Sequence, residues 1–246
     1  MDAIFSVVIG VLTLTFMEII LGIDNIIFIA IIANKLPKAD QPKARRIGLM
    51  LALVVRVVLL LGITQLKVLD ATVFDLPIPD PESHTSSTGI RYRDLIFMAG
   101  GIFLLIKSTL EIHEKVAHKE KEITAKAANT MSKIIMQIVM IDIVFSFDSI
   151  LTAVALVPPE QVSIMIAAVV VSMIVMMFFS GPVSNFINKQ PTLQILALSF
   201  LILIGFMLIV EGLHYHVPKS YLYFAVAFSV VIELINMRMK KNAPKE

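Results

Sequence analysis

The sequence predicts an all-α, polytopic membrane protein with seven transmembrane helices, arranged as two inverted three-helix repeats followed by a C-terminal helix. Three observations lead to this prediction. First, the chain is 57% hydrophobic and 16% charged, with a mean hydropathy of +0.87, so it has too few polar side chains to cover a soluble globule. Second, its apolar residues gather in runs long enough to cross a bilayer. Third, one acidic phrase occurs twice, in register, within two of those runs.

The first half of the chain holds three predicted spans. They cover residues 3–33, 47–66 and 95–110, and the second and third carry the lone charges Arg56 and Lys107. At ~1.5 Å per residue, the first span is longer than a ~30 Å hydrocarbon core requires. We therefore expect the first span to tilt, kink or unwind.

The second half holds four more predicted spans, separated by short polar segments. They cover residues 133–157, 162–186, 193–213 and 221–237, and Glu211 lies near the end of the third of these. This brings the predicted number of spans to seven.

The longer polar segments between the spans complete the organisation. Residues 67–92 are rich in proline, serine and acidic side chains, which predicts an irregular, solvated exterior loop. Residues 112–132 alternate acidic residues with lysines, which predicts a solvated linker between two halves. The predicted parts are a first three-helix repeat at 1–111, a cytoplasmic linker at 112–132, a second, inverted three-helix repeat at 133–216, and a seventh helix with its tail at 217–246.

The distribution of basic residues predicts the orientation. Of the 21 Lys and Arg residues, 15 fall in segments that the seven-span count places on one side, and only 4 fall on the other. Cytoplasmic segments hold the excess of basic residues in membrane proteins. The N-terminus is therefore predicted to lie outside and the C-terminus in the cytoplasm.

The repeated phrase occupies residues 18–27 and 142–151, at an offset of 124. The first copy reads Glu-Ile-Ile-Leu-Gly-Ile-Asp-Asn-Ile-Ile and the second reads Asp-Ile-Val-Phe-Ser-Phe-Asp-Ser-Ile-Leu. The matched polar or small positions are Glu18 with Asp142, Gly22 with Ser146, Asp24 with Asp148, and Asn25 with Ser149. Because three spans separate the copies, the second copy enters the bilayer in the opposite direction, as in transporters built from inverted repeats.

A second echo supports the repeat. Gly101 and Lys107 in the third span match Gly205 and Glu211 in the sixth, although the sign of the charge differs. Chance similarity among leucine-rich helices explains this echo equally well.

Helical geometry indicates how the phrase could form a site. Residues seven apart return to nearly the same face of a helix, so Glu18 and Asn25 share a face. Asp24 lies about 100° from Asn25, so convergence of all the polar groups requires local unwinding. Gly22 in the first copy and Ser146 in the second are the permissive places for it.

The chemistry of these groups points to a hard cation. Ionisable groups within membrane spans are costly and are functional candidates by default. Arg56 and Lys107 could neutralise two of the four acids, and the others must bind protons or a divalent cation. Oxygen ligands without Cys or clustered His favour Mn²⁺, Ca²⁺ or Mg²⁺ over Cu⁺ or Zn²⁺. The alternative is structural, with the acids pairing with the two basic residues to join helices.

Several other functions are not expected. The chain has no cysteine, so disulfides and thiolate metal sites are excluded, and its basic residues form no face for nucleic acid. The opening lacks the features of a cleavable signal, so its apolar run is expected to be a span. The Gly-x-Gly-Asp signature of intramembrane aspartyl proteases is absent, so neither an enzyme nor an organic cofactor is expected. His214 and His216, at the outer end of the sixth span, could relay protons.

The two acidic phrases, residues 17–25 and 142–149, together with the predicted spans, resemble the TerC family of bacterial integral membrane proteins. Members of that family are implicated in manganese efflux and in loading metal onto exported proteins, within a superfamily of LysE-like and cation/proton-exchanging transporters. The resemblance implies a bacterial inner-membrane location, Mn²⁺ as the transported ion, and the bilayer as the main partner. It implies metal-site roles for Glu18, Asp24, Asn25, Asp142, Asp148 and Ser149. The other charged residues of the spans, Arg56, Lys107 and Glu211, are possible charge partners on the evidence of the sequence itself.

Two functional classes remain open at this point. The first is a transporter that exports a divalent cation, Mn²⁺ before Ca²⁺ or Mg²⁺, in exchange for protons. The second is a non-transporting membrane scaffold or stress-complex subunit that uses the acids structurally. Protein partners are not predicted by the sequence.

Overall fold

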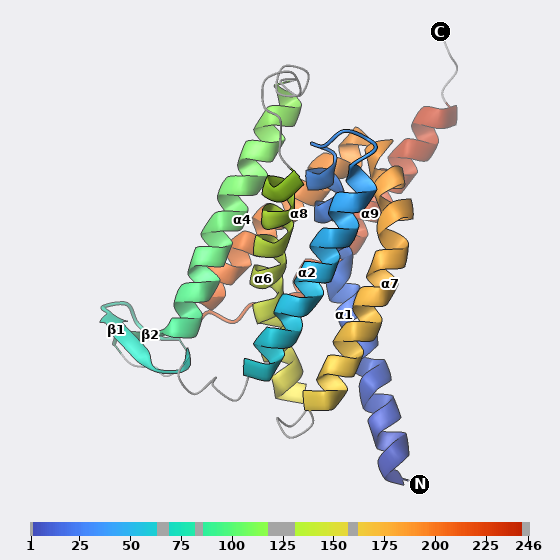
Figure 1. The fold of residues 1–246 in the computed structure, drawn as a ribbon. Helices are drawn as coiled ribbons and strands as arrows, with labels where there is room; N and C mark the ends of the chain where they lie inside the picture. The colour runs from blue at the N-terminus through green and yellow to red at the C-terminus, as the bar shows by residue number, and fades with distance from the viewer. Residues whose placement is uncertain (1, 63–68, 82–85, 118–130, 157–161, 243–246) are drawn as a thin grey trace. The chain divides into compact units, whose positions relative to one another are not determined.

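A computed structural model describes residues 2–62, 69–81, 86–117, 131–156 and 162–242 (Figure 1). The described part is mostly helical, as predicted. Its helices are α1 (Asp2–Ala33), α2 (Gln41–Leu61), α4 (Tyr92–Val116), α6 (Met131–Leu156), α7 (Val162–Asn188), α8 (Pro191–Glu211) and α9 (Lys219–Asn242). Its strands are β1 (Thr72–Leu76) and β2 (Thr88–Arg91).

The chain divides into two compact units, each built from both halves of the sequence. The first comprises Met1–Ala71 with Glu120–Lys189, and the second comprises Thr72–Lys119 with Gln190–Glu246. The predicted division into successive repeats describes the order along the sequence, and it stays a prediction.

The first unit contains α1, α2, α6 and α7, which lie side by side (Figure 1). Helix α1 packs against α7, and α2 packs against α6. Small residues allow close approach, since a Cβ built on Gly48 of α2 would lie 2.8 Å from Ile138 of α6. At one end of the unit, Asn34 and Asn188 exchange side-chain hydrogen bonds between α1 and the last residue of α7.

Helix α1 bends as expected from its length. Its segments Val8–Ile20 and Asn25–Ala33 meet at 43°, and Gly22 lies between them. Beyond the bend, the consecutive side chains of residues 28–33 are all buried. The bend therefore joins a first segment with several exposed apolar side chains to a second segment that is largely buried within the protein.

The second unit is built on the pair α4 and α8. These helices cross where two glycines meet, because a Cβ on Gly205 would lie 2.8 Å from the carbonyl oxygen of Gly101. The converse contact, from Gly101 to the carbonyl of Gly205, is closer still. Helix α8 begins with Pro191, which suits a first helical turn because proline lacks the backbone N–H that would be unsatisfied there. The two glycines of the second echo thus form one helix crossing.

A two-stranded antiparallel sheet precedes α4 in the second unit. Phe74 of β1 pairs with Ile90 of β2, and Asp75 pairs with Gly89. The prediction of an irregular loop over residues 67–92 is therefore wrong for the two strands. Thr72, Val73 and Phe74 are β-branched or aromatic residues, which favour a strand. The prediction gave more weight to the prolines and acidic residues that follow them.

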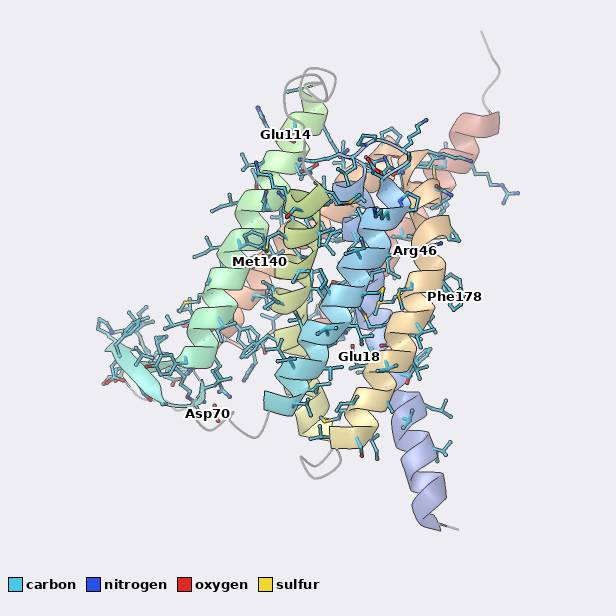
Figure 2. All side chains as sticks on the ribbon, in the orientation of Figure 1. Glu18, Arg46, Asp70, Glu114, Met140 and Phe178 are labelled. Atoms are coloured by element: carbon cyan, nitrogen blue, oxygen red, sulfur yellow. The ribbon has the colours of Figure 1, made fainter. Side chains whose placement is uncertain are left out.

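Long apolar helices confirm a membrane protein. Among the described residues, α4, α7, α8 and α9 are each long and apolar enough to cross a bilayer, and the bent α1 would make a fifth. Large apolar side chains cover their outer faces, and Phe178 on α7, for example, points away from the ribbon and is 78% exposed (Figure 2). Helix α2 falls outside this set because it carries three arginines, Arg45, Arg46 and Arg56, along its apolar length. The count of seven spans stays a prediction.

Candidate functional site

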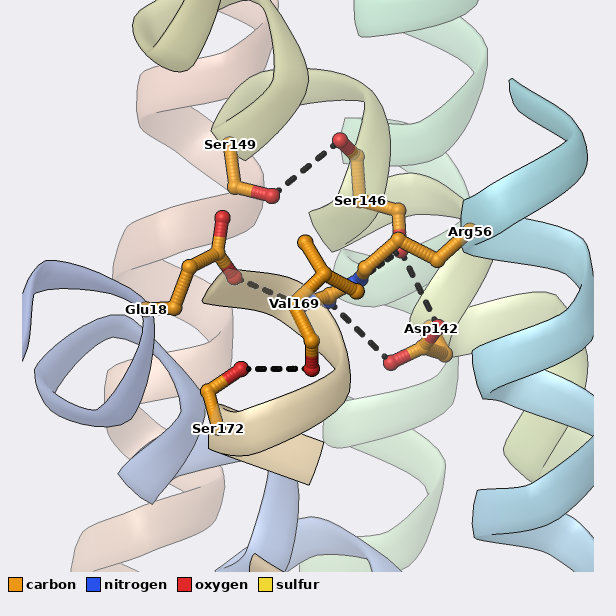
Figure 3. A network of polar contacts seen from close by, with 7 residues as sticks. All are labelled: Glu18, Arg56, Asp142, Ser146, Ser149, Val169 and Ser172. Atoms are coloured by element: carbon orange, nitrogen blue, oxygen red, sulfur yellow. Dashed lines mark hydrogen bonds and ion pairs between the residues drawn. The ribbon is translucent and has the colours of Figure 1, made fainter. Parts of the chain in front are cut away.

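A buried arginine lies at the centre of the first unit. Arg56 of α2 is 2% exposed, and each of its three side-chain nitrogens donates to a different group (Figure 3). Nη1 lies 2.7 Å from Glu18 Oε2, Nη2 lies 3.4 Å from Asp142 Oδ1, and Nε lies 2.8 Å from Ser146 Oγ. Arg56 points inward to anions, as the cost of burying an unpaired charge requires.

The two acids come from the two copies of the repeated phrase. Glu18 lies on α1 and Asp142 on α6, and both are buried. They are 124 residues apart in the sequence and meet at one guanidinium because α1 and α2 pack against α6. The fold therefore brings the first acid of each copy into one enclosed polar cluster.

Hydroxyl groups complete this cluster. Ser146 Oγ accepts from Arg56 Nε and donates to Asp142 Oδ2 at 3.0 Å. Ser149 Oγ donates to the backbone carbonyl of Ser146 at 3.2 Å. Figure 3 shows Ser149 and Ser172 of α7 on either side of Glu18, and the Ser172 hydroxyl donates to the carbonyl of Val169.

Sequence reasoning missed two of these hydroxyls. Ser146 was expected to permit unwinding, whereas here it lies in a continuous helix and its side chain joins Arg56 to Asp142. Its position in the repeated phrase was a usable signal. Ser172 lies in an apolar run and is fully buried, and its sequence context offers no comparable signal.

Two polar side chains near the cluster have unsatisfied oxygens. Asn25, a predicted metal ligand, is 4% exposed, and its Oδ1 has no hydrogen-bond partner among the described residues. Thr15 Oγ1 is also buried without a hydrogen-bond partner among the described residues. On α1 they flank Glu18, with Thr15 about one turn before it and Asn25 about two turns after it. A buried oxygen without a donor calls for an explanation, and a cation is one.

The remaining predicted site residues are not brought to this cluster by the described structure. The side chains of Asp24 and Asp148 lie outside the described residues. Lys107 is partly exposed on α4, and Glu211, at the end of α8, lies 3.8 Å from His216 Nδ1. Both belong to the second unit, and their role as charge partners stays a prediction.

Within the part of the chain that the structure describes, no three His, Asp or Glu side chains form a group that could hold a metal ion. The described acids of the phrases, Glu18 and Asp142, number only two, and Arg56 lies between them. A complete hard-cation site would need oxygens from residues whose side chains are not described. The predicted metal-site role of the six residues therefore stays a prediction.

A second buried polar cluster lies in the second unit, around His214. Its Nδ1 lies 3.1 Å from Asp80 Oδ2, and its Nε2 lies 3.0 Å from Asp94 Oδ2. All three side chains are buried. Asp80 was expected to be solvated in an acidic loop, and that expectation is wrong because His214 covers it.

The charge state of His214 follows from these contacts. An imidazole that donates from both ring nitrogens is protonated. Burial lowers the pKa of His214, but the hydrogen bonds to Asp94 and Asp80 and the negative charges of these two residues raise it by more. The pKa of His214 therefore lies above its ordinary value. Asp94 also accepts from the backbone N–H of Arg91 at 2.8 Å and lies 3.5 Å from Arg93 Nε. The cluster therefore joins the strand segment and the start of α4 to the turn after α8.

Comparison with known proteins assigns the chain to a family. The model of the integral membrane protein TerC family matches residues 5–246. The chain belongs to the TerC family. This confirms the resemblance carried by the two acidic phrases.

Two of three similar proteins are described as inner membrane proteins. It is 42% identical over 234 residues to a UPF0053 protein of Haemophilus influenzae, covering 95% of this chain and 94% of that one. It is 43% identical over 231 residues to the UPF0053 inner membrane protein YgdQ of Escherichia coli, covering 94% and 92%. It also matches the inner membrane protein YoaE of E. coli with 43% identity over 234 residues, but spans only 43% of YoaE. No solved structure matches the chain.

Proposed function

We propose that this TerC protein exports a divalent metal cation, Mn²⁺ in the first instance, through the buried acidic cluster and in exchange for protons. The observation that carries the proposal is the meeting of Glu18 and Asp142 at Arg56 in the interior of one unit. Ionisable groups are retained inside membrane proteins chiefly along ion and substrate pathways.

The ligand chemistry favours a hard cation. Carboxylate, amide and hydroxyl oxygens suit Mn²⁺, Mg²⁺ and Ca²⁺. The unsatisfied oxygens of Thr15 and Asn25 lie on α1, the helix that carries Glu18. Helix α1 therefore offers one further oxygen before Glu18 and one after it along the chain. Asp24, Asp148 and Ser149 would complete the ligand set in this proposal.

The proposal includes seven spans and two inverted repeats, with the N-terminus outside and the C-terminus in the cytoplasm. The packing supports it, because α1 with α7 and α6 with α2 are equivalent pairs under such a repeat. The α4 and α8 crossing also supports it, since Gly101 and Gly205 approach each other's carbonyls reciprocally. Substrate sites of transporters with this architecture lie near the repeat interface.

One observation favours the scaffold alternative. Arg56 already contacts both described acids, which is what a structural tie between α1, α2 and α6 would look like. Transport and a structural tie make different predictions for metal content in cells.

Manganese accumulation separates these two functions. In cells that lack manganese efflux, the intact protein should lower cellular Mn, and Glu18→Gln should abolish this effect because it removes a buried charge at nearly constant size. Asp70→Asn is the matched control, since Asp70 is exposed outside the cluster. Equal membrane levels of the three proteins are checked by immunoblot. Unchanged Mn content with the intact protein would refute export and favour the scaffold.

A further inference from the structure

We propose that Arg56 is an internal competitor of the transported cation, which holds Glu18 and Asp142 in the empty site and leaves them when a divalent cation enters. This inference rests on the proposed transport function and deepens it. It makes Arg56 a positioning residue that limits the affinity of the site and so assists release.

Arg56 and a metal ion at this site would compete for the same two carboxylates. Its Nη1 is bonded to Glu18 at 2.7 Å, and its Nη2 lies 3.4 Å from Asp142. A guanidinium that is 2% exposed has almost no water to replace these anions. A cation that takes both carboxylates must therefore displace Arg56 toward other acceptors within the protein.

Arg56 contacts the two acids at unequal distances. The contact with Asp142 is the longer one, and Asp142 also accepts from Ser146 at 3.0 Å through its other oxygen. Ser146 in turn accepts from Arg56 Nε at 2.8 Å. Asp142 therefore keeps one hydrogen bond when Arg56 releases it, so the contact with Asp142 can be lost first.

The two copies of the repeated phrase have different neighbours at one matched position, Gly22 and Ser146. Where the second copy has Ser146 facing Arg56 of α2, the first copy has Gly22 facing Met176 of α7, whose thioether a Cβ on Gly22 would meet. Under the inverted repeat, Arg56 and Met176 stand in equivalent relations to the two copies. One arginine thus serves two acids, and the equivalent place holds a neutral side chain.

The positive charge of Arg56 opposes metal binding at the two acids. When both acids are ionised, Glu18, Asp142 and Arg56 together carry a net charge of −1, and a divalent cation would make this +1. Two cations in a poorly hydrated interior repel each other strongly. The presence of Arg56 therefore weakens metal binding at these acids, whereas a purely structural arginine would strengthen binding by holding them in place.

The test measures Mn²⁺ affinity of the purified protein by isothermal titration, for wild type, Arg56→Lys and Arg56→Gln. The ammonium of lysine cannot bond three acceptors at once, so it competes less well, and glutamine does not carry a positive charge. We expect affinity to rise in the order wild type, Lys, Gln, with the Gln variant binding at least tenfold more tightly. In proteoliposomes, both variants should show lower half-saturating Mn²⁺ and lower maximal flux.

Arg45→Gln is the matched control. Arg45 is a second buried arginine on α2, but its Nη1 donates to Ser184 at 3.1 Å, not to either acid. It should leave the Mn²⁺ affinity unchanged. If removing any buried arginine from α2 changed the Mn²⁺ affinity, Arg45→Gln and Arg56→Gln would both show the change.

The outcomes distinguish the two proposals. Unchanged or weaker binding by the Lys and Gln variants would refute competition while leaving transport intact. Because Gln leaves two buried carboxylates without a counter-ion, each variant is first checked for a single species by size-exclusion chromatography. If Arg56→Gln does not fold, Arg56→Lys decides alone, since tighter binding supports competition and equal or weaker binding refutes it. No binding by wild type or by either variant would refute the proposed function and this inference together.

Discussion

Replacing Gly205 with alanine should destabilise the second unit, because α4 and α8 have no room for a methyl group at their crossing. The added Cβ would lie 2.8 Å from the carbonyl oxygen of Gly101, 3.1 Å from Leu104 Cβ and 3.2 Å from the backbone nitrogen of Leu105. Two of these neighbours are backbone atoms, which cannot rotate away. The helices must then separate by roughly 0.6 Å to restore an ordinary contact of 3.4 Å.

The magnitude follows from two opposing effects. Overpacking of this kind costs about 1–3 kcal/mol. Alanine in place of a helical glycine returns up to about 1 kcal/mol through helix propensity. We therefore expect a net loss of about 1–2 kcal/mol, which lowers Tm by roughly 2–8 °C in a protein of this size.

Thermal unfolding of the purified protein in detergent, followed by circular dichroism, measures this loss. Gly62→Ala is the control, because Gly62 has ordinary right-handed dihedrals and no neighbour within 4 Å of an added Cβ. The control should raise Tm slightly, since alanine reduces the entropy of the unfolded chain. A Gly205→Ala protein at least as stable as wild type would show that the two helices do not cross at these glycines.

Two further predictions concern pH and topology. Because the pKa of His214 is raised by Asp94 and Asp80 despite the opposing effect of burial, its stabilising contribution should be complete below the unfolded pKa of ~6.5 and should fall as pH rises through the folded pKa. Asparagine tolerates the left-handed φ of 65° at this position, so His214→Asn should remove this pH-dependent loss of stability from a plot of Tm against pH. The control His216→Asn should retain the loss. A His214→Asn protein with the same pH dependence as wild type would contradict the assignment. A reporter fused after Glu246 should be cytoplasmic and one inserted near residue 86 exterior, and cytoplasmic signals from both would refute the seven-span topology.

The sequence was sufficient to single out the two acids and the arginine that meet in the buried cluster of the first unit. Charged residues are costly in an apolar span, so Glu18, Asp142 and Arg56 were identifiable one by one. Their contacts were not predictable, because they depend on α1 and α2 packing against α6, and hydropathy does not determine which apolar helices pack together. The hydroxyl of Ser146 was similarly hidden, since serine in a span serves equally well as a small residue.

The second polar cluster was harder to predict for a different reason. Asp80 lies in a segment whose composition indicates a solvated loop, and composition cannot show that a distant residue will cover it. His214 was noted only as a possible proton relay at a span end. Its pairing with Asp80 and Asp94 joins residues 134 and 120 positions apart, which requires the tertiary structure of the second unit.

In the proposed seven-span topology, the order in which the buried charges meet follows from the order of the helices in the sequence. Helices α1 and α2 would enter the membrane before α6 exists, so Glu18 and Arg56 would have to be accommodated without Asp142. An unpaired charge at the centre of a span costs about 2.5–3.5 kcal/mol, and a pair formed between the first two helices avoids most of it. The contact between Glu18 and Arg56 is such a pair.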